Sequence, residues 1–289
     1  MRDRIFVTAA LLFVTAALLF LAKLRPKTNS KSLDLIMAAS SSSPVGDAIT
    51  AHREESSGLP YLLYKPPAFV QSSVWPLILF LHGAGESGDD PWELLSEGAT
   101  GCPLVEIQGG RANDVLSTSF VIVAPQTDRG WSAEMLQTFM AAITTGSAKG
   151  QDDLRIDAKR MYATGVSMGG YGAWEAGTLG LFAAIAPVCG AGTVEPSALG
   201  DTPVWAFHGA NDIVVPVQAS DQMVEALRME RFGKGEERRN AETGNVVKYT
   251  RYKDAPAPTG WESYLGHASW KDAYRGPELF EWMLQQSKP

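Results

Sequence analysis

The chain has 289 residues, of which 45% are hydrophobic and 20% are charged, and its formal net charge is −7. This composition is typical of a globular protein with a substantial core. Residues 1–43 carry a net charge of +4, so the rest of the chain carries −11. An acidic body is a poor electrostatic partner for nucleic acid or for an anionic membrane surface, so no nucleic-acid partner is expected.

Cysteine and histidine are scarce. The two cysteines, Cys102 and Cys189, do not form a disulfide framework. No Cys/His cluster has the spacing of metal ligands, and no glycine-rich phosphate loop occurs. Neither a metal nor any other cofactor is therefore expected.

An uncharged apolar run begins the chain, at residues 5–22. Its 18 residues are just enough to cross a bilayer, and Lys23, Leu24 and Arg25 follow it in place of a cleavage site. We therefore expect residues 1–22 to be a single-pass membrane anchor. A cleaved signal peptide for secretion is one alternative. The basic, Ser-rich residues 23–43 allow another, a two-part organelle address.

Residues 23–59 are predicted to be a basic, Ser-rich linker, and residues 60–289 a single catalytic domain. Within this domain, continuous apolar runs alternate with helical patterns. Strands are expected at 60–65, 77–81, 120–124, 161–165, 183–188, 204–207 and 246–252, and helices at 132–145, 169–179, 221–229, 268–274 and 277–286. This alternation predicts an α/β fold with a mostly parallel central sheet and helices on both faces.

The strand at 161–165 runs directly into Gly165-Val166-Ser167-Met168-Gly169, and a helix follows. This is the G-x-S-x-G nucleophile elbow in its proper strand–turn–helix context. A serine hydroxyl becomes a useful nucleophile only when a base takes its proton and the backbone presents it. We therefore predict that Ser167 is a catalytic nucleophile.

The base follows from chain order, which in hydrolases with this elbow is Ser, then Asp or Glu, then His. The four histidines are His52, His82, His208 and His267, and only the last comes late enough. Asp212 is the favoured acid because it lies just past a buried strand, where a carboxylate can reach the ring. Asp254, nearer to His267 in sequence, is the alternative.

Two backbone N–H groups are needed for the oxyanion. Met168, at the start of the helix, is predicted to supply one. Ala84 supplies the other, with Gly83 as the alternative, because this loop of small residues follows a central strand. His82 is expected to hold the loop.

Several tryptophans fall in loops expected to flank the cleft, and such residues suit aryl or acyl groups. Trp131, Trp261 and Tyr264 are the predicted substrate contacts. The segment 254–265, which contains the last two, is expected to control substrate choice.

The stretches LFLHGAGESGDD, RMYATGVSMGGYGAWEAG, FAAIAPVCGAG, PVWAFHGANDIVVPV and GHASW together resemble the α/β-hydrolase group often labelled predicted peptidases. That group is related to polyhydroxybutyrate depolymerases, feruloyl esterases and the phospholipase/carboxylesterase/thioesterase family. The resemblance covers most of residues 60–286 and departs from the group's pattern at 230–245 and 254–265. It implies an α/β-hydrolase fold and cofactor-free ester hydrolysis by Ser167, Asp212 and His267.

These observations predict a membrane-tethered serine hydrolase that cleaves small-molecule carboxylic esters through an acyl-enzyme. A thioesterase or a serine peptidase would use the same residues. A non-catalytic binding protein on a hydrolase fold is the alternative from a different class. The sequence does not predict an oligomeric state.

Overall fold

The computed structural model describes residues 48–69, 73–96, 101–145, 154–233 and 246–289. These residues form one eight-stranded sheet with the order β1-β2-β4-β3-β5-β6-β7-β8. The strands are β1 (Ile49–Arg53), β2 (Pro60–Tyr64), β3 (Trp75–Leu81), β4 (Val121–Pro125), β5 (Ile156–Val166), β6 (Ala184–Val188), β7 (Val204–Gly209) and β8 (Val247–Tyr252). β2 pairs antiparallel with both of its neighbours, β1 and β4. All the other neighbouring strands in this order are parallel.

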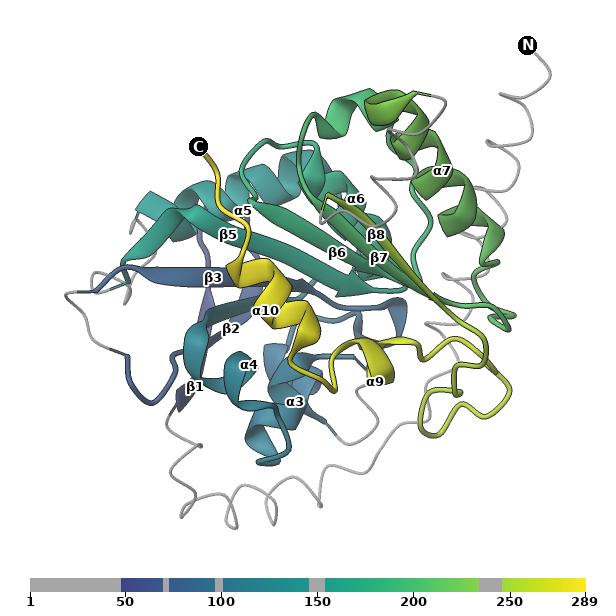
Figure 1. Ribbon diagram of the computed structural model, residues 1–289. Coiled ribbons are helices and arrows are strands. Elements are labelled where there is room, and N and C mark those ends of the chain that lie inside the picture. The colour runs from purple at the N-terminus through teal and green to yellow at the C-terminus, as the bar shows by residue number, and fades with distance from the viewer. Residues whose placement is uncertain (1–47, 70–72, 97–100, 146–153, 234–245) are drawn as a thin grey trace.

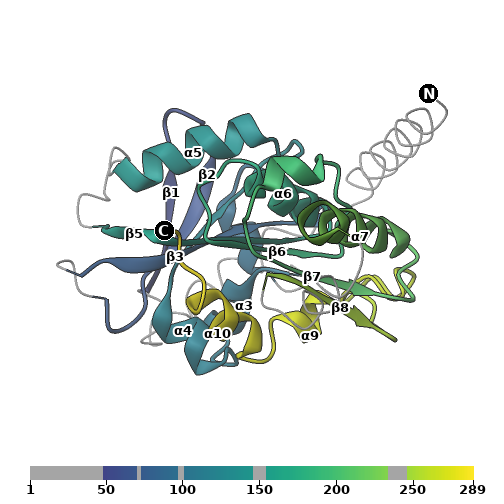
Figure 2. The same cartoon turned by 45° about the horizontal axis from the view of Figure 1, so that its top comes forward.

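Helices cover both faces of this sheet (Figures 1 and 2). One face carries α5 (Ala133–Thr145), α6 (Met168–Gly177) and α7 (Gln218–Phe232), and the other carries α3 (Pro103–Gln108), α4 (Asp114–Ser119), α9 (Trp270–Ala273) and α10 (Glu278–Leu284). Short 3-10 helices lie at η4 (Ala84–Glu86), η5 (Pro91–Leu95) and η6 (Pro196–Leu199).

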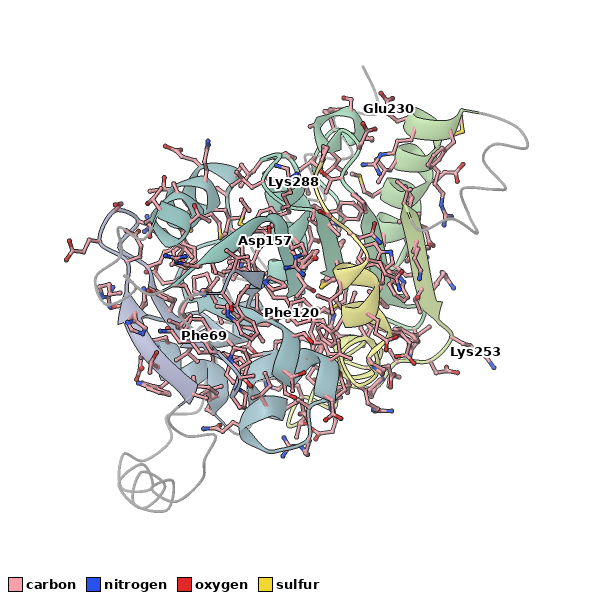
Figure 3. The ribbon with its side chains drawn as sticks, turned by 60° about the vertical axis from the view of Figure 1, so that its left-hand side comes forward. Phe69, Phe120, Asp157, Glu230, Lys253 and Lys288 are labelled. Atoms are coloured by element: carbon pink, nitrogen blue, oxygen red, sulfur yellow. The ribbon has the colours of Figure 1, made fainter. Side chains whose placement is uncertain are left out.

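Alternation along β3 shows why the strands are apolar throughout. Ile78 and Phe80 face the core under α3, α4 and α10, whereas Leu77, Leu79 and Leu81 face the core under α5 and α6. Successive strand side chains point to opposite faces, so a strand covered on both sides needs an unbroken apolar run. Figure 3 shows Phe120 in the interior, where its ring packs against Tyr162 and Phe280.

The sequence predicted strands β2 to β8 and helices α5, α6, α7, α9 and α10, with shifted ends. It missed β1, which lies inside the predicted linker 23–59, so the linker prediction is corrected there. Only Ile49 of that strand is buried. As an edge strand, β1 is held by its pairing with β2 and not by an apolar run that a pattern could reveal.

The predicted membrane segment, residues 1–22, lies outside the described residues. Among the residues described, no helix is long and apolar enough to cross a membrane. The longest of the described helices, α7, has 15 residues and carries Asp221, Glu225 and Glu230, whereas a span needs about 20 apolar residues. The prediction of a single-pass membrane location is contradicted by this finding and is withdrawn, together with the membrane as a partner.

Candidate active site

Ser167 stands in a sharp turn between β5 and α6. Its φ of 54° and ψ of −115° are unusual for a residue with a side chain and carry strain. Flanking glycines make the turn possible. A Cβ atom on Gly165 would overlap the carbonyl of Gly169, and one on Gly169 would overlap the carbonyl of Leu81. The predicted elbow therefore exists as a backbone conformation that these two glycines permit.

The side chains of Ser167, His267 and Asp212 form one hydrogen-bonded chain. His267 Nε2 lies 2.9 Å from Ser167 Oγ, and His267 Nδ1 lies 2.8 Å from Asp212 Oδ2. Because the carboxylate can only accept, Nδ1 carries the proton and Nε2 is left to accept from the serine hydroxyl. All three residues are buried. Asp254 is exposed instead.

Asp212 is held by four donors. Its Oδ1 accepts from the backbone N–H groups of Val214 and Val215, at 2.8 and 3.0 Å. Its Oδ2 accepts from His267 and from His208 Nε2 at 3.1 Å. Burial alone would raise the pKa of Asp212, but the bonds from His208 and His267 outweigh it and lower that pKa to about 2. Asp212 is therefore ionised at neutral pH.

His208 is the site residue whose contact the sequence analysis missed. It is fully buried, and its Nε2 also lies 2.9 Å from the carbonyl oxygen of Val215. Since a carbonyl can only accept, His208 Nε2 carries a proton. This N–H donates to both the Val215 carbonyl and Asp212 Oδ2. The spacing of four residues across the turn from His208 to Asp212 was the one signal in the sequence.

The loop after β3 lies against the nucleophile. A Cβ atom on Gly83 would sit 3.6 Å from Ser167 Cβ, and η4 begins at the next residue, Ala84. On the other side of Ser167, α6 begins at Met168. The first N–H groups of a helix have no partner within it. Ser167 is thus flanked by the starts of two helices, at Gly83 and Ala84 on one side and at Met168 on the other.

His82 anchors this loop. Its Nε2 accepts from the backbone N–H of Thr127 at 3.1 Å, so the proton lies on Nδ1, which donates to the Gly83 carbonyl at 2.6 Å. Burial of the ring lowers the pKa of His82 to about 4, although the bond to Gly83 opposes this. The neutral ring therefore holds the loop, in line with the expected role.

Trp131 takes part in the same support. Its indole N–H donates to the His82 carbonyl at 3.1 Å, and its ring packs against the His82 ring. Only 8% of its surface is exposed. The prediction that Trp131 contacts substrate is therefore replaced by a supporting role, because its polar atom and its ring are already used within the protein.

His82 makes stability depend on pH. Its folded pKa lies below its unfolded value, so its contribution is complete above about pH 6.5 and is lost as the pH falls toward 4, since the unfolded chain binds the proton more readily. From pH 7 to pH 5, the contribution of His82 should lower the free energy of unfolding by about 2 kcal/mol. Urea unfolding at both pH values, compared between the parent and His82→Gln, measures it. An equal loss in both proteins would contradict the assignment.

Trp261 and Tyr264 lie on the loop before His267. Both are half-buried, their rings meet edge to face at 5.1 Å, and the His267 N–H donates to the Tyr264 carbonyl at 3.2 Å. The structure thus puts both predicted substrate residues on the segment that carries His267.

A cavity of about 710 Å³ adjoins the site between α3 and α9. Gly101, Cys102 and Trp270 are among its lining residues. The Trp270 ring packs edge-on against the His267 ring at 5.6 Å, and Gly101 lies against the side chain of Val166, next to Ser167. Ser167, His267 and Asp212 themselves are not among the residues that line this cavity.

A mostly parallel sheet, a serine at a strained elbow after a central strand, and a histidine and an aspartate from later loops define the α/β-hydrolase fold. Solved structures agree with this class. A thermostable esterase is 31% identical over 84% of this chain, with a TM-score of 0.60, and this chain spans 64% of that protein's length.

Two further structures share the fold at 14% identity. A putative dienelactone hydrolase from Klebsiella pneumoniae has a TM-score of 0.55, with 82% of this chain and 98% of that one covered. A feruloyl esterase module from Clostridium thermocellum, complexed with sinapinate, has a TM-score of 0.54, with 89% and 93% covered. No protein-family model and no curated protein matches. The chain therefore has the α/β-hydrolase fold.

Proposed function

We propose that this protein is a serine hydrolase that cleaves carboxylic esters of small molecules through an acyl-enzyme. The observation that carries the proposal is the bonded chain from Ser167 through His267 to Asp212. Its protons are arranged for the task, because His267 Nε2 is free to accept the serine proton. The esterase at 31% identity supports the same reaction class.

In the first half-reaction, Ser167 Oγ attacks the ester carbonyl while its proton passes to His267 Nε2. Asp212, ionised at neutral pH, stabilises the imidazolium that forms. The carbonyl oxygen becomes an oxyanion, and we assign the N–H groups of Met168 and Ala84, with Gly83 as the alternative to Ala84, as its donors. His267 then gives the proton to the leaving alcohol as the C–O bond breaks.

The second half-reaction repeats these roles with water. His267 takes a proton from the water, whose oxygen attacks the acyl-enzyme carbonyl. The same N–H groups hold the second oxyanion. The proton returns to Ser167 Oγ as the acid leaves, so the enzyme ends in its starting state and no cofactor takes part.

The experiment uses a fluorophosphonate probe, which reacts with activated serine hydroxyls. We expect labelling on the peptide that contains Ser167, together with hydrolysis of p-nitrophenyl butyrate. A matched butyryl thioester and a peptide p-nitroanilide decide between esterase, thioesterase and peptidase. If the folded protein is neither labelled nor active on any of the three, it is a binding protein on a hydrolase fold and the proposal fails.

A further inference from the structure

Two large aliphatic side chains are exposed directly beside the proposed acid and base. Ile213 follows Asp212 and is 67% exposed, and Leu265 lies two residues before His267 and is 53% exposed. The N–H of Ile213 donates to the carbonyl of Leu265 at 3.3 Å. These side chains therefore come from two different loops that lie side by side.

This pairing is unusual within the described part of the chain. The other large apolar side chains exposed there are Val74, Trp92 and Val246. Single exposed apolar residues are normal on a protein surface, whereas contiguous exposed apolar patches mark binding sites. Trp261 and Tyr264, half-buried and on the same loop as Leu265, extend the apolar area. We call these four residues the rim.

The rim is held in a fixed shape. The side-chain amide of Asn211 donates to the Ala255 carbonyl at 3.0 Å and accepts from the Ala255 N–H at 2.9 Å. At Gly266, φ is 82°, and a Cβ atom there would overlap the carbonyl of Asn211. The loop with Asn211 and the loop with Gly266 therefore contact each other through their backbones. These contacts fix the positions of Ile213 and Leu265 relative to each other.

The chemistry of His267 decides which part of an ester meets the rim. The imidazolium must hand its proton to the leaving alcohol oxygen, so that oxygen lies within hydrogen-bond reach of Nε2. The loop with Gly83 and Ala84 is the one placed against Ser167 for the oxyanion. A surface built from the residues next to His267 and Asp212 therefore adjoins the alcohol part of the substrate.

We propose that the rim of Ile213, Leu265, Trp261 and Tyr264 binds the alcohol part of the substrate, and that the substrates are esters of bulky, uncharged, apolar alcohols. This inference rests on the proposed ester hydrolysis. Glu262 is exposed on the same loop, so an anionic alcohol part would be repelled.

The test varies the alcohol at a constant acyl group. Methyl, butyl, cyclohexyl and benzyl acetates all form the same acetyl-enzyme, so differences in kcat/KM report only the step in which the alcohol is present. We expect kcat/KM to rise from methyl to benzyl acetate in the parent. In the double variant Ile213→Thr, Leu265→Gln, the ratio of kcat/KM for benzyl acetate to kcat/KM for methyl acetate should fall by about 10- to 200-fold.

Val74→Thr is the matched control. This valine is 56% exposed and precedes the amino end of β3, whereas Ser167 follows the carboxyl end of the neighbouring parallel strand β5, so its replacement should leave the preference unchanged. A second series, benzyl esters from acetate to octanoate, varies the acyl group. The rim proposal is overturned if the double variant changes the acyl preference and not the alcohol preference, or changes neither. Absence of ester hydrolysis and of probe labelling in the parent would instead overturn the proposed function.

Discussion

Replacing Ser167 with alanine should lower kcat for ester hydrolysis by about 10⁴-fold or more and abolish labelling by the fluorophosphonate probe. The reason is that Ser167 Oγ is the atom proposed to form the covalent bond to the acyl group. Its hydroxyl makes a hydrogen bond to His267 Nε2, and the loss of one such bond cannot explain an effect of this size. The loss would therefore report chemistry.

The fold should tolerate this substitution. Ser167 is 7% exposed and already adopts the strained turn, which alanine would adopt at a similar cost. Thermal unfolding of Ser167→Ala should stay close to that of the parent. Ser197→Ala, an exposed serine on η6, should keep both activity and labelling. Activity of Ser167→Ala within about tenfold of the parent would end the assignment of the nucleophile.

The layered sheet was predictable because strands covered on both faces must be apolar throughout, which leaves a plain signal such as 204–207. Elements without that requirement were missed. The strand β1 is mostly exposed, and α3 and α4 have six residues each, too few for a helical period to stand out. The long strand β5 was predicted only over its buried half, since its first residues, Ile156–Arg160, are not buried.

For the site, the order of the residues along the chain predicted the nucleophile and the base. The sequence did not predict which side chains lie close together in space. The elbow and the single late histidine indicated Ser167 and His267, because only one histidine follows the elbow and the position of the acid. Which side chain meets a ring depends on how loops fold back, so Trp131 was placed in the cleft when it is buried under the loop after β3. The other histidine that donates to Asp212, His208, could not be separated from a turn histidine for the same reason.

Asp212→Asn should lower kcat for ester hydrolysis by about 10⁴-fold, because the acid would no longer fix the tautomer of His267. Asp254, the alternative acid, should not have this effect. The position of the amide follows from the structure. Oδ1 accepts from two backbone N–H groups, Val214 and Val215, so the asparagine oxygen must stay there. Its NH₂ group then takes the place of Oδ2 and faces His267 Nδ1.

A donor in that place would make Nδ1 of His267 the acceptor and move the imidazole proton to Nε2. A protonated Nε2 could no longer accept the proton of Ser167. The same NH₂ would meet the donor on His208 Nε2. Asp254→Asn is the matched control, since this exposed residue should change kcat by no more than about twofold. Steady-state kinetics on one ester, with both variants prepared side by side, measure the difference. A severe loss in Asp254→Asn, or a mild one in Asp212→Asn, would show that the bond from His267 to Asp212 does not set the tautomer.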